Sequence, residues 1–284
     1  KTKEGLVRMC ACRGTAGFAH VSCLAEQAKI LVAEAMENNL GNKAFGERFA
    51  QWYACSLCEQ RYHGVVRCAL GWACWKTYVG RPETDWTRLS AMTQLGNGLS
   101  SAGHHEDALA VQETELSTLR RIGASEQKVL VAQGNLANTY GRLGQKEKAL
   151  RMRRDVYSGT LKLHGEQNIN CLSDAFNYAV DLIDAKRFEE ARSLLRKTIP
   201  VARRALGDPH DLTLSMRSLY AQTLYKDDGA TLANLREAVT TLEDAERTAR
   251  RVLGGAHPLV AQIGACLRCA RAALAARDPQ PLGA

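Results

Sequence analysis

The sequence has no apolar run of membrane length and no leader segment. No stretch approaches the roughly 20 apolar residues that a membrane span requires, and no basic-apolar segment opens the chain. We therefore predict no membrane span and a cytoplasmic location. The chain opens at Lys1 rather than at a methionine, so we also expect it to be a fragment of a longer protein.

Catalytic signatures are also lacking. We find no Ser-His-Asp arrangement, no phosphate-cradling glycine loop and no carboxylate pair. The 284 residues are 45% hydrophobic and 24% charged, which are globular proportions that exclude collagen, mucin-like stalks and disordered tails. The formal net charge is +8. Basic runs such as Arg151–Arg154 have no interleaved aromatics, so we expect these cations to offset helix dipoles and predict no nucleic-acid partner.

Tryptophan and cysteine are scarce beyond the first third of the chain. All four tryptophans lie at or before Trp86, and seven of the ten cysteines lie within the first 74 residues. Such a shift in composition usually marks a domain boundary. In a long chain without a secretory leader, cysteines are more typical of free thiols or metal ligands than of disulfides.

The early cysteines form closely spaced pairs with one histidine. Zinc prefers four thiolate or imidazole ligands in a tetrahedron, and a C-x-x-C hook places two thiolates on one ion. We therefore predict bound Zn²⁺, with unliganded thiols and disulfides as the alternatives. The six candidate ligands are Cys10, Cys12, His20, Cys23, Cys55 and Cys58.

These pairs resemble the RING-CH (RING-variant) zinc fingers, whose eight ligands run four Cys, one His and three Cys. The likeness rests on Cys10-Ala-Cys12, seven intervening residues, His20-Val-Ser-Cys23 and the ending Cys55-Ser-Leu-Cys58-Glu-Gln-Arg-Tyr62. It covers about 50 residues. The family's first C-x-x-C pair is absent, and the chain begins only nine residues before Cys10, as it would in a truncated domain.

The resemblance implies a small α+β domain over residues 1–64 with cross-braced ligands. Cys10, Cys12, Cys55 and Cys58 would then form a complete four-thiolate site. His20 and Cys23 would form half of a second site. We expect a helix over residues 24–39, ended by Gly41, in the long spacer before Cys55.

An apolar helix is predicted to follow the finger, within a connecting segment of residues 65–85. Its two thiols, Cys68 and Cys74, are six residues apart and so do not share a helical face well. We interpret them as packed core thiols, with metal or redox chemistry as the alternative.

The remaining residues, 86–284, repeat with a period of about 42. The segment Gln94–Leu109 recurs at Asn135–Leu150 with an offset of 41, and Gly123, Gly165 and Gly207 follow at intervals of 42. The next interval, to Gly254, is 47 and absorbs extra residues near Lys226-Asp-Asp-Gly-Ala230. Each unit is predicted to form a helical hairpin that buries its apolar face only by stacking on its neighbours.

The pattern L-A-x-x-Y-x-x-x-G-x-x-x-x-A-L resembles a tetratricopeptide repeat. The loops Ala205–His210 and Val252–Pro258 resemble the kinesin-light-chain variety. We therefore expect an all-α fold: a right-handed α-solenoid of about four hairpins, preceded by the small zinc domain. His210 and His257 belong to these loops and are not predicted to be catalytic.

Repeats of this type resemble arrays whose first helices line a concave, peptide-binding face. Amides suit an extended peptide because each offers both a donor and an acceptor. The alternative is that these side chains are ordinary solvated surface residues. The candidates are Asn97, Asn135, Asn138, Arg142 and Asn177.

Two functions remain open. In the first, the repeats hold a protein client while the RING-CH-like domain recruits a ubiquitin-conjugating enzyme, so that the protein acts as a ubiquitin ligase by proximity. In the second, the protein is a zinc-stabilised scaffold without transferase activity. Trp52 would supply an apolar contact to the conjugating enzyme in the first case, or pack beside the zinc in either.

Overall fold

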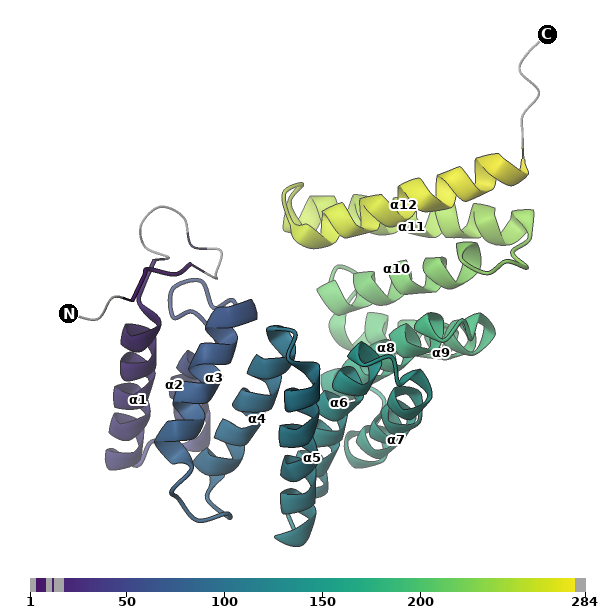
Figure 1. Ribbon diagram of the computed structural model, residues 1–284. Coiled ribbons are helices and arrows are strands. Elements are labelled where there is room, and N and C mark those ends of the chain that lie inside the picture. The colour runs from purple at the N-terminus through teal and green to yellow at the C-terminus, as the bar shows by residue number, and fades with distance from the viewer. Residues whose placement is uncertain (1–3, 9–11, 13–17, 279–284) are drawn as a thin grey trace. The chain divides into compact units, whose positions relative to one another are not determined.

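The computed structural model describes residues 4–8, 12 and 18–278, which are predominantly helical (Figure 1). The described part contains no extended strand, only two isolated β-bridges in the cysteine-rich segment. The chain divides into two compact units, unit 1 from residue 1 to 144 and unit 2 from 145 to 284. The all-helical architecture expected of the repeats is therefore confirmed.

The long spacer between Cys23 and Cys55 forms most of the first two helices of unit 1. The expected helix over residues 24–39 is α1, which ends earlier than predicted because Asn39 adopts a positive φ of 49° and the Leu40 N–H turns back to the Ala35 carbonyl at 3.0 Å. Within this unit α3 packs on α4, α4 on α5 and α5 on α6. The elements are α1 (Val21–Glu37), α2 (Asn42–Phe49), the short 3-10 helix η2 (Ala50–Trp52), α3 (Gly64–Tyr78), α4 (Trp86–Ser101), α5 (His105–Arg121) and α6 (Glu126–Arg142).

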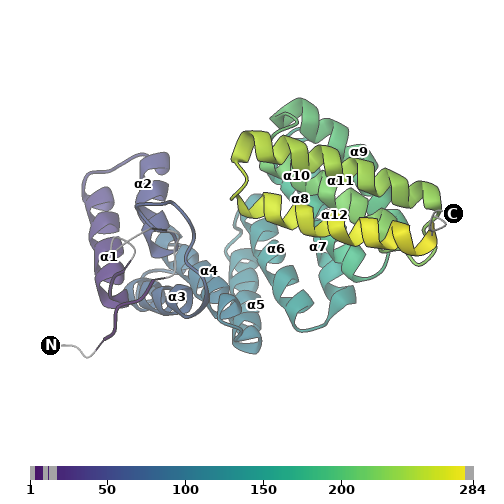
Figure 2. The ribbon, with the colours of Figure 1, turned by 90° about the horizontal axis from the view of Figure 1, so that it is seen from above.

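Unit 2 is an array of antiparallel helices in which each helix packs on the next, from α7 to α12. Figure 2 shows α11 and α12 side by side, and these two helices are in contact. Their apolar faces join one continuous core that includes Leu195, Leu214, Leu242 and Ile263. The helices are α7 (Lys146–His164), α8 (Ile169–Asp184), α9 (Phe188–Leu206), α10 (Asp211–Tyr225), α11 (Leu232–Leu253) and α12 (Pro258–Arg277).

Each loop between repeats of unit 2 contains a glycine, at the position that the period predicts, and a side chain that caps the next helix. Gly165, Gly207 and Gly254 all have positive φ, which costs glycine little because it has no Cβ. Three residues later the chain caps the next helix: His210 Nδ1 accepts from the Leu212 N–H at 3.1 Å, and His257 Nδ1 accepts from the Leu259 N–H at 3.3 Å. These histidines therefore have a structural role as N-caps.

The longer interval before Gly254 arises from two places. The connection between α10 and α11 runs from residue 226 to 231, close to where the sequence located the extra residues. Helix α11 also has 22 residues, whereas α7 and α9 have 19 each. The insertion thus lengthens a loop and a helix without interrupting the order of packing.

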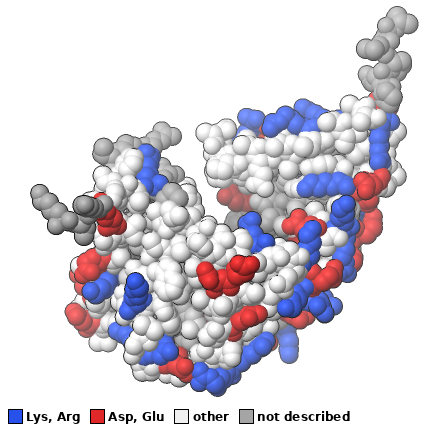
Figure 3. All heavy atoms as spheres, in the orientation of Figure 1, with Lys and Arg blue, Asp and Glu red and all other residues white. Residues whose placement is uncertain are grey.

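The basic run Arg151–Arg154 on α7 contains one buried arginine. Arg153 is buried, and its Nε donates to Asp181 Oδ2 on α8 at 3.1 Å. Offsetting the helix dipole therefore does not account for Arg153, whose charge is compensated by Asp181 inside unit 2. On the face drawn in Figure 3, basic and acidic side chains are interspersed over the surface.

Helix α12 meets the length and composition of a membrane span. Its 20 residues have a mean hydropathy of 1.4 over the most apolar window, of which 28% is buried. Leu259, Val260, Ile263 and Leu267 are buried in the core of unit 2. These four side chains therefore pack α12 onto the rest of unit 2.

Helices α3 and α4 approach each other through two glycines. A Cβ placed at Gly71 would lie 2.8 Å from the Gln94 carbonyl oxygen, and one placed at Gly98 would lie 2.8 Å from the Arg67 carbonyl oxygen. Both neighbours are backbone atoms and cannot rotate away. The connecting helix is therefore tightly packed against the first helix of the array.

This contact predicts that Gly71→Ala destabilises unit 1. The added methyl group must push two backbones apart, an overpacking that costs roughly 1–3 kcal/mol. The matched control is Gly46→Ala in α2, where nothing lies within 4 Å of the new Cβ and the better helix former gains up to about 1 kcal/mol. Urea unfolding of the two variants should shift the midpoint in opposite directions; equal shifts would contradict the close α3–α4 contact.

Candidate metal centre and repeat surface

The last two cysteines lie on a tight backbone hairpin. The Tyr62 N–H donates to the Tyr53 carbonyl at 2.9 Å, and the Cys55 N–H donates to the Gln60 carbonyl at 2.9 Å. Glu59 completes the turn with a positive φ of 58°, and its N–H donates to the Cys55 carbonyl at 2.8 Å. This hairpin fixes Cys55 and Cys58 near one another, as a C-x-x-C hook requires.

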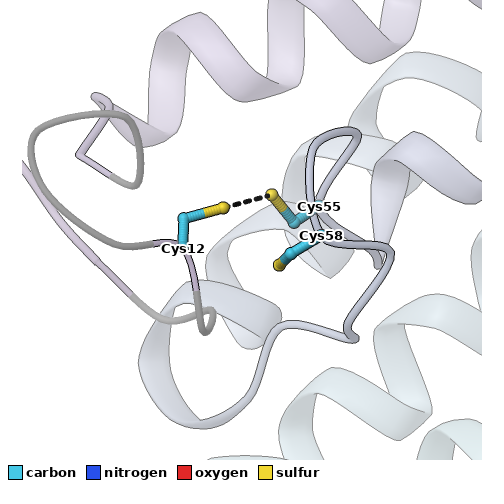
Figure 4. Close-up of side chains that lie close together, drawn as sticks. All are labelled: Cys12, Cys55 and Cys58. Carbon is cyan, nitrogen blue, oxygen red and sulfur yellow. Dashed lines mark hydrogen bonds between the residues drawn. The ribbon is translucent and has the colours of Figure 1, made fainter.

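A third thiol comes to this hairpin from the N-terminal segment. Val7 and Ala19 exchange backbone hydrogen bonds of 2.9 and 3.1 Å, and Cys12 lies between them in the chain. Figure 4 shows the Cys12 and Cys55 side chains directed toward each other, with Cys58 beside them. The Cys12 and Cys55 sulfurs are 3.6 Å apart, and the sulfurs of all three residues lie within 4.8 Å of one another.

The donor set and its geometry fit a zinc ion. A disulfide would bring two sulfurs to about 2.05 Å, whereas thiolates about 2.3 Å from a tetrahedral zinc lie about 3.8 Å apart. The 3.6 Å separation of Cys12 and Cys55 excludes a disulfide in this structure and suits two thiolates on one zinc, as it also suits two free thiols in contact. Both thiols are buried, and they rest on an apolar cluster with Tyr62, Val66 and Leu70. Three thiols held in a largely buried cluster are thus suited to Zn²⁺.

The remaining predicted ligands are placed separately. Cys10 lies outside the described residues. His20 and Cys23 stand at the start of α1, with His20 Nδ1 and Cys23 Sγ 3.8 Å apart. They do not belong to the three-thiol cluster of the described residues. His20 and Cys23 are therefore neighbours at the start of α1, and the half site stays a prediction.

The aromatic and thiol side chains near the three-thiol cluster pack in the interior of unit 1. Trp52 is only 1% exposed, and its ring packs edge-on against Tyr78 with the centroids 6.0 Å apart. It is therefore not available for contact with another protein. Cys74 is fully buried and Cys68 half-buried, and burial raises the pKa of both thiols. The interpretation of these two cysteines as packed core thiols is supported.

The predicted amide row occupies the first helices of the repeats. On α6, Asn138 and Arg142 are exposed, and Asn135 is half-buried. Their spacing of three and four residues places these three side chains on one face of the helix. Asn97 on α4 is half-buried, and α4 packs against α6 within unit 1. Asn177 is half-buried on α8 in unit 2.

Sequence reasoning missed the buried acidic residue Glu115 on α5. It recurs at helical spacing with the buried residues Ala108, Gln112 and Leu119, so it falls on the inward face of the helix. That apolar periodicity was the available signal. The Glu115 side chain is only 4% exposed, and burial raises the pKa of its carboxyl to about 7.

The comparisons with known proteins concern the repeats. Residues 129–170 and 177–211 match the family model of the tetratricopeptide repeat. No curated protein sequence matches the chain. Among solved structures, a putative kinesin light chain with nearly identical TPR-like repeats from Podospora anserina has a TM-score of 0.55 at 18% identity, covering 83% of this chain and 98% of that one.

Two further solved structures share the fold. BtubC (BKLC) from P. vanneervenii has a TM-score of 0.54 at 12% identity, covering 94% of this chain and 95% of that one. A Rap protein complexed with competence and sporulation factor has a TM-score of 0.50 at 14% identity, covering 89% of this chain and 66% of that one. The chain therefore contains tetratricopeptide repeats and has structural neighbours of the kinesin-light-chain type.

Proposed function

We propose that the protein is an interaction scaffold whose repeats capture an extended peptide of a protein client and whose N-terminal module is held together by zinc. The observation that carries the proposal is the run of tetratricopeptide repeats over residues 129–170 and 177–211. Stacked repeats create extended binding surfaces. The Rap protein in the comparison is itself complexed with competence and sporulation factor, which supports a protein or peptide ligand.

The amides of α6 are the proposed contacts to the client backbone. Asn138 is exposed and Asn135 half-buried on the same helical face, so both can turn an amide toward a peptide. An amide donates and accepts at once, and it can therefore hold a strand-like backbone whatever the peptide's sequence. The affinity is expected to be modest because ordering a flexible peptide costs free energy.

Changing Asn135 and Asn138 together to Ala should weaken client capture. Two lost hydrogen bonds of about 0.5–1.5 kcal/mol each predict roughly five- to 150-fold weaker binding. The control is Gln27→Ala, an exposed amide on α1, outside the repeats. Affinity capture followed by titration of the identified client measures both; if the double variant binds as tightly as wild type, the client does not use this face.

Ubiquitin-ligase activity is the second candidate. The convergence of Cys12, Cys55 and Cys58 favours it, because this is the ligand set that a RING-CH-like cross-brace pairs. Leu57, between the two cysteines of the hairpin, is 67% exposed and offers an apolar contact to a conjugating enzyme. The burial of Trp52 removes the other candidate contact, so the scaffold without transferase activity is the better supported function.

An autoubiquitination assay separates the two candidates. The full-length gene product, with any upstream Cys-x-x-Cys pair included, is incubated with activating enzyme, a panel of conjugating enzymes and ubiquitin. The scaffold function predicts no transfer above the reaction that lacks the protein. Transfer that is lost in Leu57→Ala, with zinc retained, would instead establish the ligase.

A further inference from the structure

A pocket of about 470 Å³ lies inside unit 1, separate from the cysteine cluster. Helices α2, α4, α5 and α6 contribute its walls, together with the segment that follows η2. Cavities of roughly 300–1,000 Å³ hold small ligands or single side chains. The pocket is therefore large enough for one long side chain of a partner.

One wall of the pocket is aromatic. Trp86 is 41% exposed, and its ring meets Phe49 edge-on with the centroids 4.9 Å apart. Tyr53 also lines the cavity, with the Arg61 guanidinium 5.8 Å from the centre of its ring. Aromatic rings attract cations through their negative faces, and the attraction grows when water is excluded. This wall favours an apolar stem that carries a positive charge.

The pocket also contains a carboxyl group that lacks a full set of partners. Glu115 lines the cavity, and its Oε1 accepts a hydrogen bond from the Thr93 hydroxyl. Its Oε2 is buried and has no hydrogen-bond partner. Leaving a buried acceptor unsatisfied costs free energy that a bound donor would recover. Burial raises the pKa of Glu115 to about 7, and a cation held beside it would restore the ionised carboxylate.

The pocket lies on the same helical faces as the amide row. Val131 lines the cavity and precedes Asn135 by four residues on α6, so the two side chains lie about 6 Å apart along the helix axis. Lys128, a further lining residue, is exposed. A peptide that follows the amide row would thus reach the opening of the pocket from the side of Val131.

We propose that this pocket binds the lysine side chain of the client peptide, with its ammonium group on Glu115 and its methylene stem against Trp86 and Phe49. The proposal rests on the proposed function in taking the ligand to be a peptide. Lysine fits because its stem is long and apolar and its head offers three donors. The Glu115 carboxyl group selects this side chain over apolar ones of the same length, and the exposed Lys128 is the one basic side chain among the lining residues.

The test uses the full zinc-loaded chain and two matched pentapeptides, acetyl-Ala-Ala-Lys-Ala-Ala-amide and its norleucine counterpart. Norleucine keeps the stem and removes the ammonium group. Binding is followed through the Trp86 indole resonance by NMR. We expect the lysine peptide to bind at least about tenfold more tightly than the norleucine peptide, because a hydrogen bond to a charged group contributes about 1.5–3 kcal/mol.

Variants and a free amine complete the experiment. Glu115→Gln keeps the shape and should abolish the preference for lysine, whereas Glu106→Gln at an exposed position of α5 should retain it. Equal binding of the two peptides, an unchanged preference in Glu115→Gln, or no binding of either peptide would overturn the proposal. Binding of n-hexylammonium as tight as that of the lysine peptide would overturn the assignment to a peptide. The protein could prefer the lysine peptide while the Asn135→Ala/Asn138→Ala variant still captures the client fully. This result would contradict the proposed amide contacts of α6 and leave the lysine pocket supported.

Discussion

Removing zinc should loosen the N-terminal part of unit 1 and leave unit 2 folded. Structural zinc contributes on the order of 10–16 kcal/mol to small fingers, whereas unit 2 has an apolar core of its own. On addition of a chelator, hydrogen exchange should therefore rise most in residues 18–20 and 53–62. The helices α8 to α11 should keep their protection, and most of the helical circular dichroism should remain.

The apolar cluster beneath the finger limits how far this loss can spread. Phe49 and Trp52 pack in one cluster with Cys74, Tyr78 and Ala91, so the contacts of the finger continue into α3 and α4. Complete loss of helicity on metal removal would show that the two units unfold together. No change anywhere in unit 1 would show that the thiols do not bind a structural metal.

Cys55→Ser provides the matched test on the protein side. Changing even an outer-shell partner of a zinc ligand costs about 10–100-fold in affinity, so loss of a direct thiolate should weaken zinc binding by at least about 100-fold. The control is Cys269→Ser, an exposed thiol on α12. Competition with a chromophoric chelator measures both variants, and Cys269→Ser should bind zinc as wild type does.

Replacing Glu115 with Gln should remove a pH-dependent loss of stability. The carboxyl ionises near pH 4.5 in the unfolded chain, but its pKa in the folded protein is about 7 because burial disfavours the charged form. Below pH 4.5 the Glu115 carboxyl is protonated in the folded and the unfolded state, so its burial does not lower the free energy of unfolding through ionisation. As the pH rises from 4.5 to 7, the unfolded state gains by ionising first, so the wild type loses about 3 kcal/mol of unfolding free energy.

Urea unfolding at pH 5 and pH 8 measures this difference. Wild type and Glu115→Gln share the same cysteine cluster, so the pH dependence of any metal bound there cancels in the comparison. The variant should be more stable than wild type at pH 8 by up to about 3 kcal/mol and closer to it at pH 5. Glu106→Gln should not reproduce the effect. A wild-type-to-variant difference that is the same at both pH values would mean that Glu115 is ionised in both states.

The repeats could be predicted from the sequence because their signals are local and recur. Gly165, Gly207 and Gly254 each follow a helix with a positive φ, and His210 and His257 each cap the next one. The recurring glycine does not predict the turn in the copy where another residue stands at that position. Lys186 adopts a φ of 59° at the turn where the preceding copy has Gly144, so tertiary packing maintains a turn that its residue type does not favour.

The contacts between distant segments could not be predicted. Gly71 and Gly98 are single glycines inside helices, and nothing local pairs each with the backbone of the other helix. The pairing of Cys12 with Cys55, by contrast, followed from the order of ligands in a resembling family. The pocket needed the three-dimensional arrangement, because Glu115, Trp86 and Val131 come from three different helices.

The central claim is that Cys10, Cys12, Cys55 and Cys58 hold one zinc ion. Elemental analysis of the purified chain, kept reduced and free of chelator, tests it most directly. We predict about one equivalent of zinc per chain, and a loss of that zinc in Cys55→Ser but not in Cys269→Ser. Less than half an equivalent in the wild type, or the same content in Cys55→Ser, would contradict the account.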